Sequence, residues 1–553
     1  MNKKLLQIVC FIFCTFSISA QYKIDKLSMT YGEEITDDKG KIVKMIGEKN
    51  DKIYTLVLKG SSNYFLKIFD SKAMKQISLN PIVLPEINDK DIDFEEVVLL
   101  NDKLYVIGSV FNSKEKKFTL VAISVSESGI LGTNMITLFE SIVAKRSDRG
   151  GFYFKNSPDD AMLLVMHTAL FDKEDAMKYE IKLFDEQMKT FFSTEDKVAF
   201  DDEKKDFEFT IADFDVNNKD DVFLVISEGF RDRKLKEKRE KIELHVFKQA
   251  NKYIKEVVRF DIKDQEIVNC KMLATAKNTV KLVGFYSSVR ESGRSNKELK
   301  GVYNATISLD NLTDKTIKYN EFDYDTKVKL LGERRAKKGK DVKPLYNIHS
   351  IIEKNDGGLI VISEYRTAYV GRASGFGPIA IVPITYDANE AIVTCLKPDG
   401  TLEWSNVVAK EQQVEITVSS FNIFGVTSAN PSNFNVALGV SLPLGVMGKG
   451  PEYISLIPIY KNGQLNILFN DNKKNKGITN IEEIKALGNF NNAVPTLFVF
   501  DDKGNITRKD PEEVIKEELV IRPGIYKRKN SNEYLIYASR KSKDKIGRMT
   551  LND

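Results

Sequence analysis

Residues 354–366 read KNDGGLIVISEYR, a polar turn followed by a strongly apolar strand, and this pattern recurs along the chain. Seven further copies are KNDKIYTLVLK (49–59), NDKLYVIGSVF (101–111), PDDAMLLVMHTAL (158–170), NKDDVFLVISEGF (218–230), KNTVKLVGFYS (277–287), KNGQLNILFND (461–471) and NSNEYLIYASR (530–540). Asn, Asp and Gly in the turns readily adopt the positive φ angles that tight hairpins need. Val, Ile, Leu, Tyr and Phe in the strands are typical of half-buried sheets. The pattern therefore indicates a repeated β unit.

A third strand follows each copy, and a weaker fourth strand usually comes next. In the sixth unit these strands are AIVTCLKPDG (391–400) and TLEWSNVV (401–408). Four antiparallel strands that recur every ~50–60 residues are typical of propeller blades. We therefore predict an all-β protein, a β-propeller of about eight four-stranded blades, with seven blades as the alternative.

The last unit ends after its third strand, KIGRMTL (545–551), which leaves its sheet one strand short. The segment KIDKLSMTY (23–31) has the composition of a strand and is predicted to fill that place. A blade completed by both ends of the chain closes the ring and covers two open sheet edges.

Residues 1–20 have the features of a secretory signal peptide. Lys3 and Lys4 precede an apolar stretch from Leu5 to Phe16, and Ala20-Gln21 is a suitable cleavage site. Residues 21–553 are then expected to form one propeller domain with no transmembrane helix. The predicted location is the periplasm or the periplasmic side of an outer membrane, with the cell surface or secretion as the alternative.

Charge and cysteine content exclude two further classes. The formal net charge is +4, and removal of Lys3 and Lys4 leaves +2, which argues against nucleic acid as a partner. Cys270 and Cys395 remain after cleavage and fall on different strands of neighbouring repeats. We therefore expect two free, buried thiols instead of a disulfide.

The long connections are predicted to gather on one face of the disc. The chain reverses at each turn of a blade, so connections between strands two and three share a face with those between blades. The long segments fall in these two kinds of connection: 229–241, 287–300, 323–345, 366–389, 411–452 and 471–493. Long loops on a rigid frame usually carry binding, so we expect this face to bind partners.

Two of these connections are strongly basic, 231–241 and 327–343, and both are predicted to be helical in part. The residues leave open whether they form solvated surface or an anion or membrane-headgroup site. The hypothetical basic face consists of Arg231, Arg233, Lys234, Arg334, Arg335, Lys337 and Lys338.

Two other stretches, 373–386 and 416–448, contain no charged residue. Their apolar side chains are candidates for a partner-binding patch, because exposed patches of several hundred Å² mark such sites. The alternative is an added hairpin that folds onto the disc or extends its core. The candidate residues are Phe376, Ile379, Phe421, Phe424, Phe434, Leu442 and Leu444.

The sequence offers no catalytic constellation, no metal site and no cofactor motif. His167, His245 and His349 fall on strands of three different blades, whereas zinc sites and Ser-His-Asp triads need their members together. Only His349, expected near the central channel, is well placed for function. We therefore expect a protein that is not an enzyme.

The C-terminal two-fifths of the chain resembles a set of exported, mostly uncharacterised Bacteroidota proteins. The runs that carry the resemblance are DYDTKVKLLGERRAKKGK, IHSIIEKNDGGLIVISEY, CLKPDGTLEWSNVVAKEQQ, LNILFNDNKKN and VPTLFVFDDKGNITRK. The resemblance implies an exported propeller and assigns no catalytic residues.

A rigid disc with uncharged loops on one face is also similar to what the plug of the type IX protein-secretion translocon needs. The leading hypothesis is a non-enzymatic periplasmic or outer-membrane-associated interaction module. Its expected partner is an envelope protein, such as an outer-membrane barrel or a secretion translocon of which it is an accessory or plug subunit. Two alternatives are a glycan- or peptide-processing enzyme that uses the channel and a small-molecule-binding sensor module.

Overall fold

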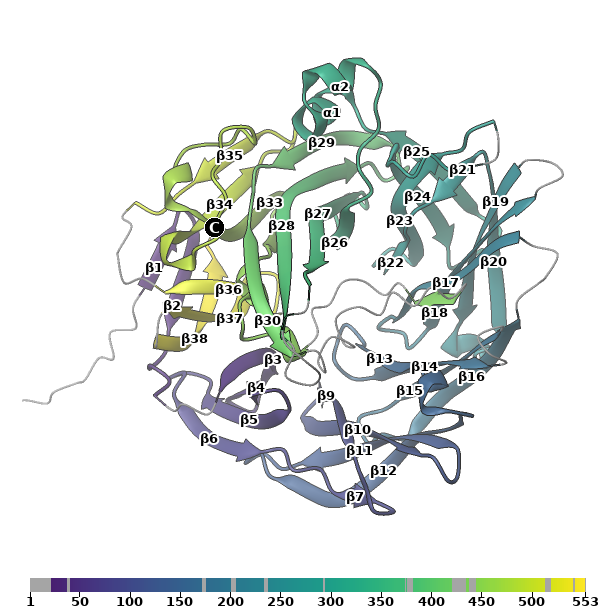
Figure 1. Cartoon of the computed structure of the whole chain (residues 1–553), viewed down its shortest axis with the longest axis vertical. Helices are drawn as coiled ribbons and strands as arrows, with labels where there is room; N and C mark the ends of the chain where they lie inside the picture. Colours follow the sequence, from purple (N-terminus) through teal and green to yellow (C-terminus); the bar gives the residue numbers. More distant parts are fainter. Residues whose placement is uncertain are drawn as a thin grey trace, which may run out of the picture.

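Eight sheets of four or five strands stand in a ring around a central opening in the computed structural model of the chain (Figure 1). The predicted all-β propeller with eight blades is thereby confirmed, and the seven-bladed alternative is excluded. The predicted signal peptide, residues 1–20, lies outside the described residues. The structure describes residues 21–552 apart from 37–39, 172–175, 200–204, 233–236, 292–293, 373, 375–380, 420–433, 437–443, 513–518 and 541–542.

The first four blades occupy the N-terminal half of the chain, and in each of them the strands pair in chain order. The first blade consists of β3 (Lys41–Lys49), β4 (Lys52–Lys59), β5 (Asn63–Asp70) and β6 (Gln76–Pro81). The second consists of β9 (Asp93–Leu100), β10 (Lys103–Asn112), β11 (Lys117–Val125) and β12 (Leu131–Ile142). The third consists of β13 (Gly151–Asn156), β14 (Leu163–Phe171), β15 (Ala176–Phe184) and β16 (Thr190–Ala199). The fourth consists of β17 (Lys205–Val216), β18 (Val222–Asp232), β19 (Glu237–Phe247) and β20 (Lys255–Lys263).

The other four blades carry most of the additions to the basic unit. The fifth has a divided inner strand and consists of β21 (Gln265–Ile267), β22 (Lys271–Ala274), β23 (Thr279–Ser288), β24 (Gly301–Ser308) and β25 (Lys315–Glu321). The sixth consists of β26 (Tyr346–Glu353), β27 (Leu359–Val370), β28 (Ile381–Leu396) and β29 (Leu402–Val408), and β30 (Gln413–Ser419) pairs with β28. The seventh consists of β32 (Ile457–Lys461), β33 (Gln464–Asn472), β34 (Ala493–Phe500) and β35 (Ile506–Lys509). The eighth consists of β36 (Val520–Arg528), β37 (Glu533–Arg540), β38 (Lys543–Leu551), β2 (Leu27–Tyr31) and β1 (Gln21–Ile24).

The two ends of the chain close the ring in the eighth blade, as predicted. Strand β2 pairs with β38, with Leu27 opposite Leu551. The N-terminal segment contributes a hairpin, β1 and β2, where one strand was predicted. Across the seam, the Arg548 guanidinium donates to Glu48 of the first blade at 2.9 Å. Closure therefore rests on sheet pairing within the eighth blade and on an ion pair between the eighth blade and the first.

Short turns with the expected residues connect strands one and two of the blades. Asn50 and Asp51 have φ angles of 50° and 56°, and Asn462 and Gly463 have 51° and 81°. These left-handed conformations cost little for Asn, Asp and Gly, which explains why the turn residues could identify the hairpins in the sequence.

The core lies between neighbouring blades. The cluster that joins the fourth and fifth blades includes Phe223, Leu244, Val280 and Leu282, all without solvent exposure. Full burial of each such side chain stabilises the fold by about 1.5–3 kcal/mol. Cys270 and Cys395 are buried and free, as predicted.

One of the two basic connections is helical, and the described residues of the other are in strands. The segment 323–345 contains α1 (Tyr324–Leu331) and α2 (Glu333–Lys337), and the Asp323 carboxylate caps α1 by accepting the Thr326 N–H at 2.7 Å. In 231–241 the prediction of helix is wrong for the described residues, 231–232 and 237–241, because they belong to β18 and β19, with Asp232 opposite Glu237. The backbone pairing of the two strands outweighs the helix propensity of this Lys- and Glu-rich segment.

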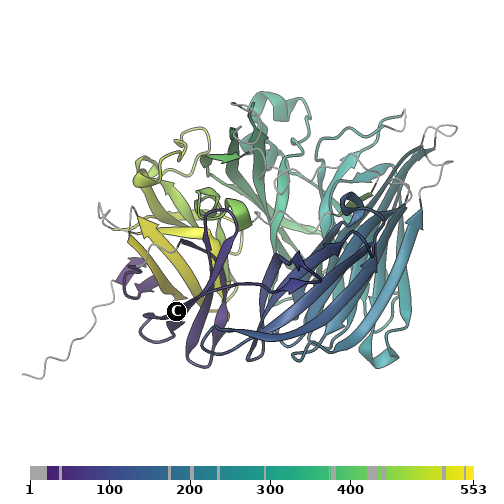
Figure 2. The same cartoon turned by 60° about the horizontal axis from the view of Figure 1, so that its bottom comes forward.

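The long connections rise from one face of the disc, and Figure 2 shows the two teal helices on that face. The connections also contain β31 (Phe434–Val436), the small pair of β7 (Glu86–Ile87) and β8 (Lys90–Asp91), and short 3-10 helices. These 3-10 helices are Arg146–Asp148, Gln249–Asn251, Leu444–Val446, Pro451–Tyr453, Lys473–Asn475 and Phe490–Asn492. Within the described residues, no helix has the length and apolar character needed to cross a membrane.

Candidate functional site

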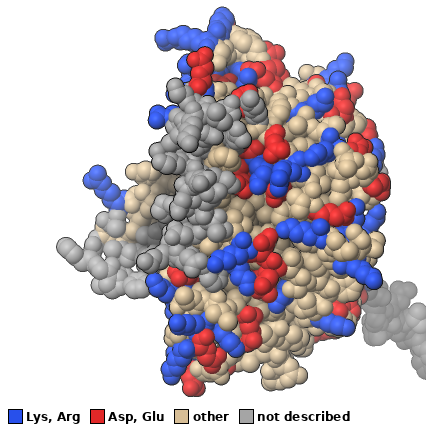
Figure 3. All heavy atoms as spheres, turned by 90° about the vertical axis from the view of Figure 1, so that its right-hand side faces the viewer, with Lys and Arg blue, Asp and Glu red and all other residues tan. Residues whose placement is uncertain are grey.

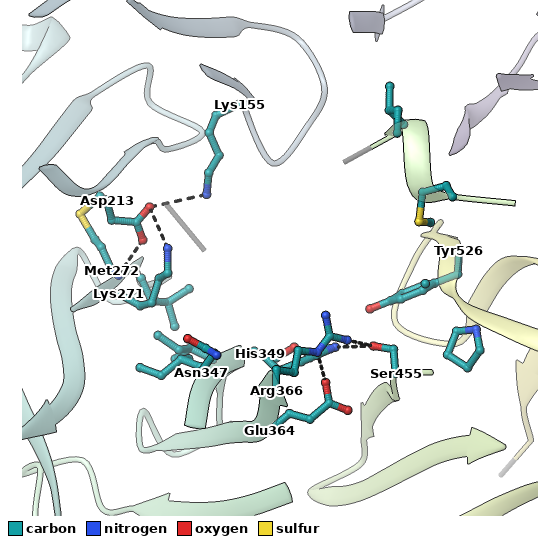
Figure 4. Close-up of a pocket in the computed structure, with 18 of the residues that line it drawn as sticks. Lys155, Asp213, Lys271, Met272, Asn347, His349, Glu364, Arg366, Ser455 and Tyr526 are labelled. Carbon is teal, nitrogen blue, oxygen red and sulfur yellow. Dashed lines mark hydrogen bonds and ion pairs between the residues drawn. The ribbon is translucent and has the colours of Figure 1, made fainter. Parts of the chain in front are cut away.

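The inner strands of the blades surround a cavity of about 520 Å³ (Figure 4). Volumes of about 300–1,000 Å³ are usual for small-molecule sites. The cavity is lined by polar side chains from five blades: Lys155 (β13), Asp213 (β17), Lys271 (β22), Asn347 and His349 (β26), Glu364 and Arg366 (β27), and Tyr526 (β36). A ring of blades thus brings together residues that are far apart in the sequence.

Irregularities in the first and second strands of the blades direct several of these side chains. The pairing register shifts between Ile211 and Asp213, between Ile348 and Ser350, and between Glu364 and Arg366. Bulges of this kind bend a strand and redirect its side chains, and they are frequent at functional sites.

Lys271 owes its place to the break in the inner strand of the fifth blade. The break brings the Asn269 carbonyl so close to Gly284 that a Cβ at this glycine would lie 1.8 Å from the oxygen. A side chain at position 284 would therefore push the broken strand away. The glycine is needed to place Lys271 on the cavity wall.

Asp213 is the centre of a charged cluster on one wall of the cavity. It is 3% exposed, and its two oxygens accept the N–H groups of Phe214 and Met272, each at 3.0 Å. The ammonium groups of Lys155 and Lys271 each lie 3.9 Å from Asp213 Oδ1. Burial lowers the pKa of Lys271.

Glu364 is the centre of a second, tighter cluster in the sixth blade. Its fully buried carboxylate lies 2.9 Å from Lys410 Nζ and accepts from Arg366 Nε. Burial opposes its ionisation, but the charges of Lys410, Arg366 and His349 hold its pKa at about 2. Arg366 also donates to Ser455 Oγ at 2.6 Å, so the guanidinium connects the cluster to the cavity.

His349 and Ser455 come closest to a catalytic pair in this cavity. Ser455 Oγ lies 3.4 Å from His349 Nε2, and His349 Nδ1 lies 2.7 Å from the hydroxyl of Ser350. Burial lowers the pKa of His349 to about 4, so its ring is neutral at pH 7. A Ser-His-Asp triad has a carboxylate at Nδ1. Because Nδ1 faces a hydroxyl here, the pair lacks the third member of a triad.

Described residues of the connection 411–452 lie at the cavity and beside the fourth blade. Leu444 and Met447 line the cavity and pack against the core of the first blade. Strand β31, the light-green strand beside β17 in Figure 1, adds to the fourth blade in parallel, with Phe434 opposite Phe209. The connection therefore contacts blades on both sides of the opening.

The sixth blade also carries a three-stranded extension, formed by the end of β27, the start of β28, and β30. One side of the extension packs Val382, Ile384 and Ile416 against Val446, in a core separate from those of the blades. On the other side, Tyr369 is 69% exposed and Ile381 is 49% exposed. The extension thus presents large apolar side chains to solvent from a packed sheet.

The uncharged residues predicted to bind a partner have different outcomes. Phe376, Ile379, Phe421, Phe424 and Leu442 lie outside the described residues. Phe434 lies in β31, and Leu444 is half-buried at the cavity. For Ile416, Val446 and Met447 the alternative of added core is correct, because all three are buried.

Of the predicted basic residues, the structure describes four at α2 and one at the end of β18. Arg334, Arg335, Lys337 and Lys338 are exposed at α2, whereas Arg233 and Lys234 lie outside the described residues and Arg231 falls at the end of β18. On the rim seen in Figure 3, basic and acidic side chains are interspersed. Ion pairs there include Lys255 with Asp196 at 3.1 Å and Arg259 with Glu243 at 2.6 Å.

Sequence reasoning selected His349 but missed Lys155, Asp213, Lys271 and Arg366. For the first three of these a signal was present, because a charged residue inside the first strand of a blade must face the channel or be buried. Among the residues that the structure describes, no three His, Cys, Asp or Glu side chains are grouped as metal ligands would be.

No family model matches the chain, and no curated protein matches its sequence. Among solved structures, it is similar to the propeller of Dos1, with 8% identity, a TM-score of 0.37 and 95% of each chain covered. It is also similar to the WD40 domain of SCAP from fission yeast, with 7% identity, a TM-score of 0.24, and 84% of this chain and 93% of that chain covered. It is similar as well to a GH43 endo-arabinanase from Bacillus licheniformis, with 12% identity, a TM-score of 0.19, and 50% of this chain and 97% of that chain covered. The chain is a β-propeller protein by its own sheet topology, and these likenesses assign it no activity.

Proposed function

We propose that this protein is an exported, non-enzymatic interaction module that docks an envelope protein through the face carrying its long connections. The propeller fold is suited to such a role, because it holds many connecting loops on a rigid disc. The proposed location is the periplasm, and the proposed partner is an outer-membrane protein, such as a component of a secretion translocon that the disc serves as accessory or plug.

The observation that carries this proposal is the sixth-blade extension. Tyr369 and Ile381 are its large exposed apolar side chains, and the packed sheet beneath holds their backbone in place. In the sequence, the neighbouring residues 373–380 include no charged side chain. Apolar groups held ready on a rigid frame lose little entropy on binding, which favours their use as contact residues.

The test is recovery of partners from detergent-solubilised outer membranes with the tagged protein. The double variant Tyr369→Ser/Ile381→Ser removes the exposed apolar groups without touching the packed side of the extension. Its matched control is Ile254→Ser/Val257→Ser, which removes two residues of similar exposure, 60% and 46%, from the fourth blade.

We expect the wild type and the control to recover the same outer-membrane protein in equal amounts. The double variant should recover at least ~10-fold less of it, because it lacks two interface anchors. Equal recovery by all three proteins, or no outer-membrane protein above background, would contradict the proposal. These substitutions are preferable to replacing 416–448 by a linker, since that would also remove buried Ile416, Val446 and Met447.

A further inference from the structure

In the central cavity the cations face the interior and the carboxylates lie behind them (Figure 4). The side chains of Lys155, Lys271 and Arg366 are 38%, 18% and 17% exposed. Those of Asp213 and Glu364 are 5% and 0% exposed. A molecule that enters the cavity therefore meets ammonium and guanidinium groups before it meets a carboxylate.

Asp213 makes no short hydrogen bond to Lys155 or Lys271. Its oxygens already accept two backbone N–H groups at 3.0 Å, and the lysine nitrogens lie 3.9 Å away. Hydrogen bonds between an ammonium and a carboxylate are about 2.7–2.9 Å long. Lys155 is thus held near Asp213 by charge, at a distance that leaves room for an oxyanion to lie closer to it than Asp213 does, and Lys271 Nζ lies at the same distance from Asp213 Oδ1.

Asp215 is a further carboxyl group of β17, and the charges of Lys155 and Lys271 act on it. It accepts the Val216 N–H at 2.9 Å, and burial raises its pKa. The ammonium groups of Lys155 and Lys271, 38% and 18% exposed, suit the wall formed by β13, β17 and β22 to a negatively charged group.

The opposite wall offers polar groups of a different kind. Arg366 and Ser455 are joined at 2.6 Å, and the hydroxyl of Tyr526 points into the cavity. Leu444 and Met447 add an apolar cover. This combination fits a small molecule with an acidic group at one end and both polar and hydrocarbon parts beyond it.

We infer that the central cavity binds a small organic acid, whose carboxylate or phosphate group sits between Lys155 and Lys271. Arg366, Ser455 and Tyr526 contact its polar groups. This site is separate from the proposed docking surface and does not depend on it.

Isothermal titration calorimetry tests the site with four probes: succinate, citrate, glycerol 3-phosphate and inorganic phosphate. Each titration is matched with sodium chloride at the same ionic strength. We expect at least one probe to bind one-to-one, and Lys155→Met and Lys271→Met each to weaken it ~10-fold or more, as loss of a charged hydrogen bond predicts. Binding of the carboxylates alone or of the phosphates alone identifies the acidic group.

The matched control is Lys117→Met on the rim, whose side chain is 40% exposed and lies 3.7 Å from Glu140. It should bind the probe like the wild type, and Lys155→Arg should keep most of the affinity because it keeps the charge. The inference is overturned if no probe binds beyond the chloride baseline, or if Lys117→Met weakens binding as much as the cavity variants. Thermal unfolding of every variant shows whether a loss of binding is a loss of folding.

Discussion

Two groups of charged residues in this propeller have similar composition and different geometry. In the seventh blade, Arg508 is 2% exposed and donates to Asp471 at 2.7 Å, to Asp510 at 2.8 Å and to the Ile478 carbonyl at 3.0 Å. In the cavity, Lys155 is 38% exposed and lies 3.9 Å from Asp213. One cation has close partners on several sides, and the other has a distant one.

The difference separates a structural ion pair from a binding group. The bonds of Arg508 attach the connection 471–493 to its blade, and a planar guanidinium with several donors suits that task. A lysine held at a distance contributes little to stability but keeps its donors available. Buried charge therefore marks a site only when its geometry leaves donors facing a cavity.

The largest expected effect is that of Arg508→Met, which leaves Asp471 and Asp510 buried without their cation. We expect the free energy of unfolding to fall by about 3–5 kcal/mol, because an uncompensated buried charge is strongly destabilising. The matched variant Lys155→Met should change it by less than about 0.5 kcal/mol. Urea denaturation measures both, and equal losses would remove the distinction between the two groups.

A smaller effect is expected for Asp213→Asn. The amide keeps one acceptor but turns an NH₂ toward one of the two backbone N–H groups, so unfolding should become easier by about 1 kcal/mol. The same change frees Lys155 and Lys271 from their counter-charge, so calorimetry should show tighter binding of the acid probe. Weaker binding would mean that Asp213 contacts the ligand or positions the lysines.

The smallest expected effect concerns pH. Burial holds the pKa of His349 at about 4, below the usual 6.5, so the unfolded chain binds a proton first as the pH falls. The stability from the neutral ring is complete above pH 6.5 and is lost as the pH falls toward 4. By pH 6 the loss should reach about 0.8 kcal/mol, and His349→Gln should remove it. Thermal midpoints at pH 7.5 and 6 measure this loss, and the same loss in the variant would show that other groups cause it.

Much of the fold could be predicted because its signals are local. The turn residues Asn50 and Asn462 adopt the positive φ that hairpins need, and the strands that follow them are where the apolar runs placed them. The pairing of Leu27 with Leu551 was also predictable, since the last repeat lacked a strand. The burial of Cys270 and Cys395 was expected from their places in predicted strands, although Cys270 lies in the break between β21 and β22.

The helix predicted for 231–241 shows where local reasoning failed. Lys- and Glu-rich segments favour helix in isolation. Here Arg239 of β19 pairs with Phe230 of β18, and the pairing of the two strands decides the conformation. Likewise, the absence of charge from 416–448 suggested exposed contact residues, whereas part of that connection is core.

By itself the sequence determined the repeat, the number of blades and the closure of the ring, because each depends on hydrophobic alternation and turn chemistry within one repeat. Only the tertiary structure decided the site. Closing the ring brings Lys155, Asp213, Lys271 and Arg366 from four blades to one cavity, and bulges that no periodicity reveals turn Asp213 and Arg366 toward it. The physical reason is that side-chain direction at the channel depends on strand register, which neighbouring strands set together.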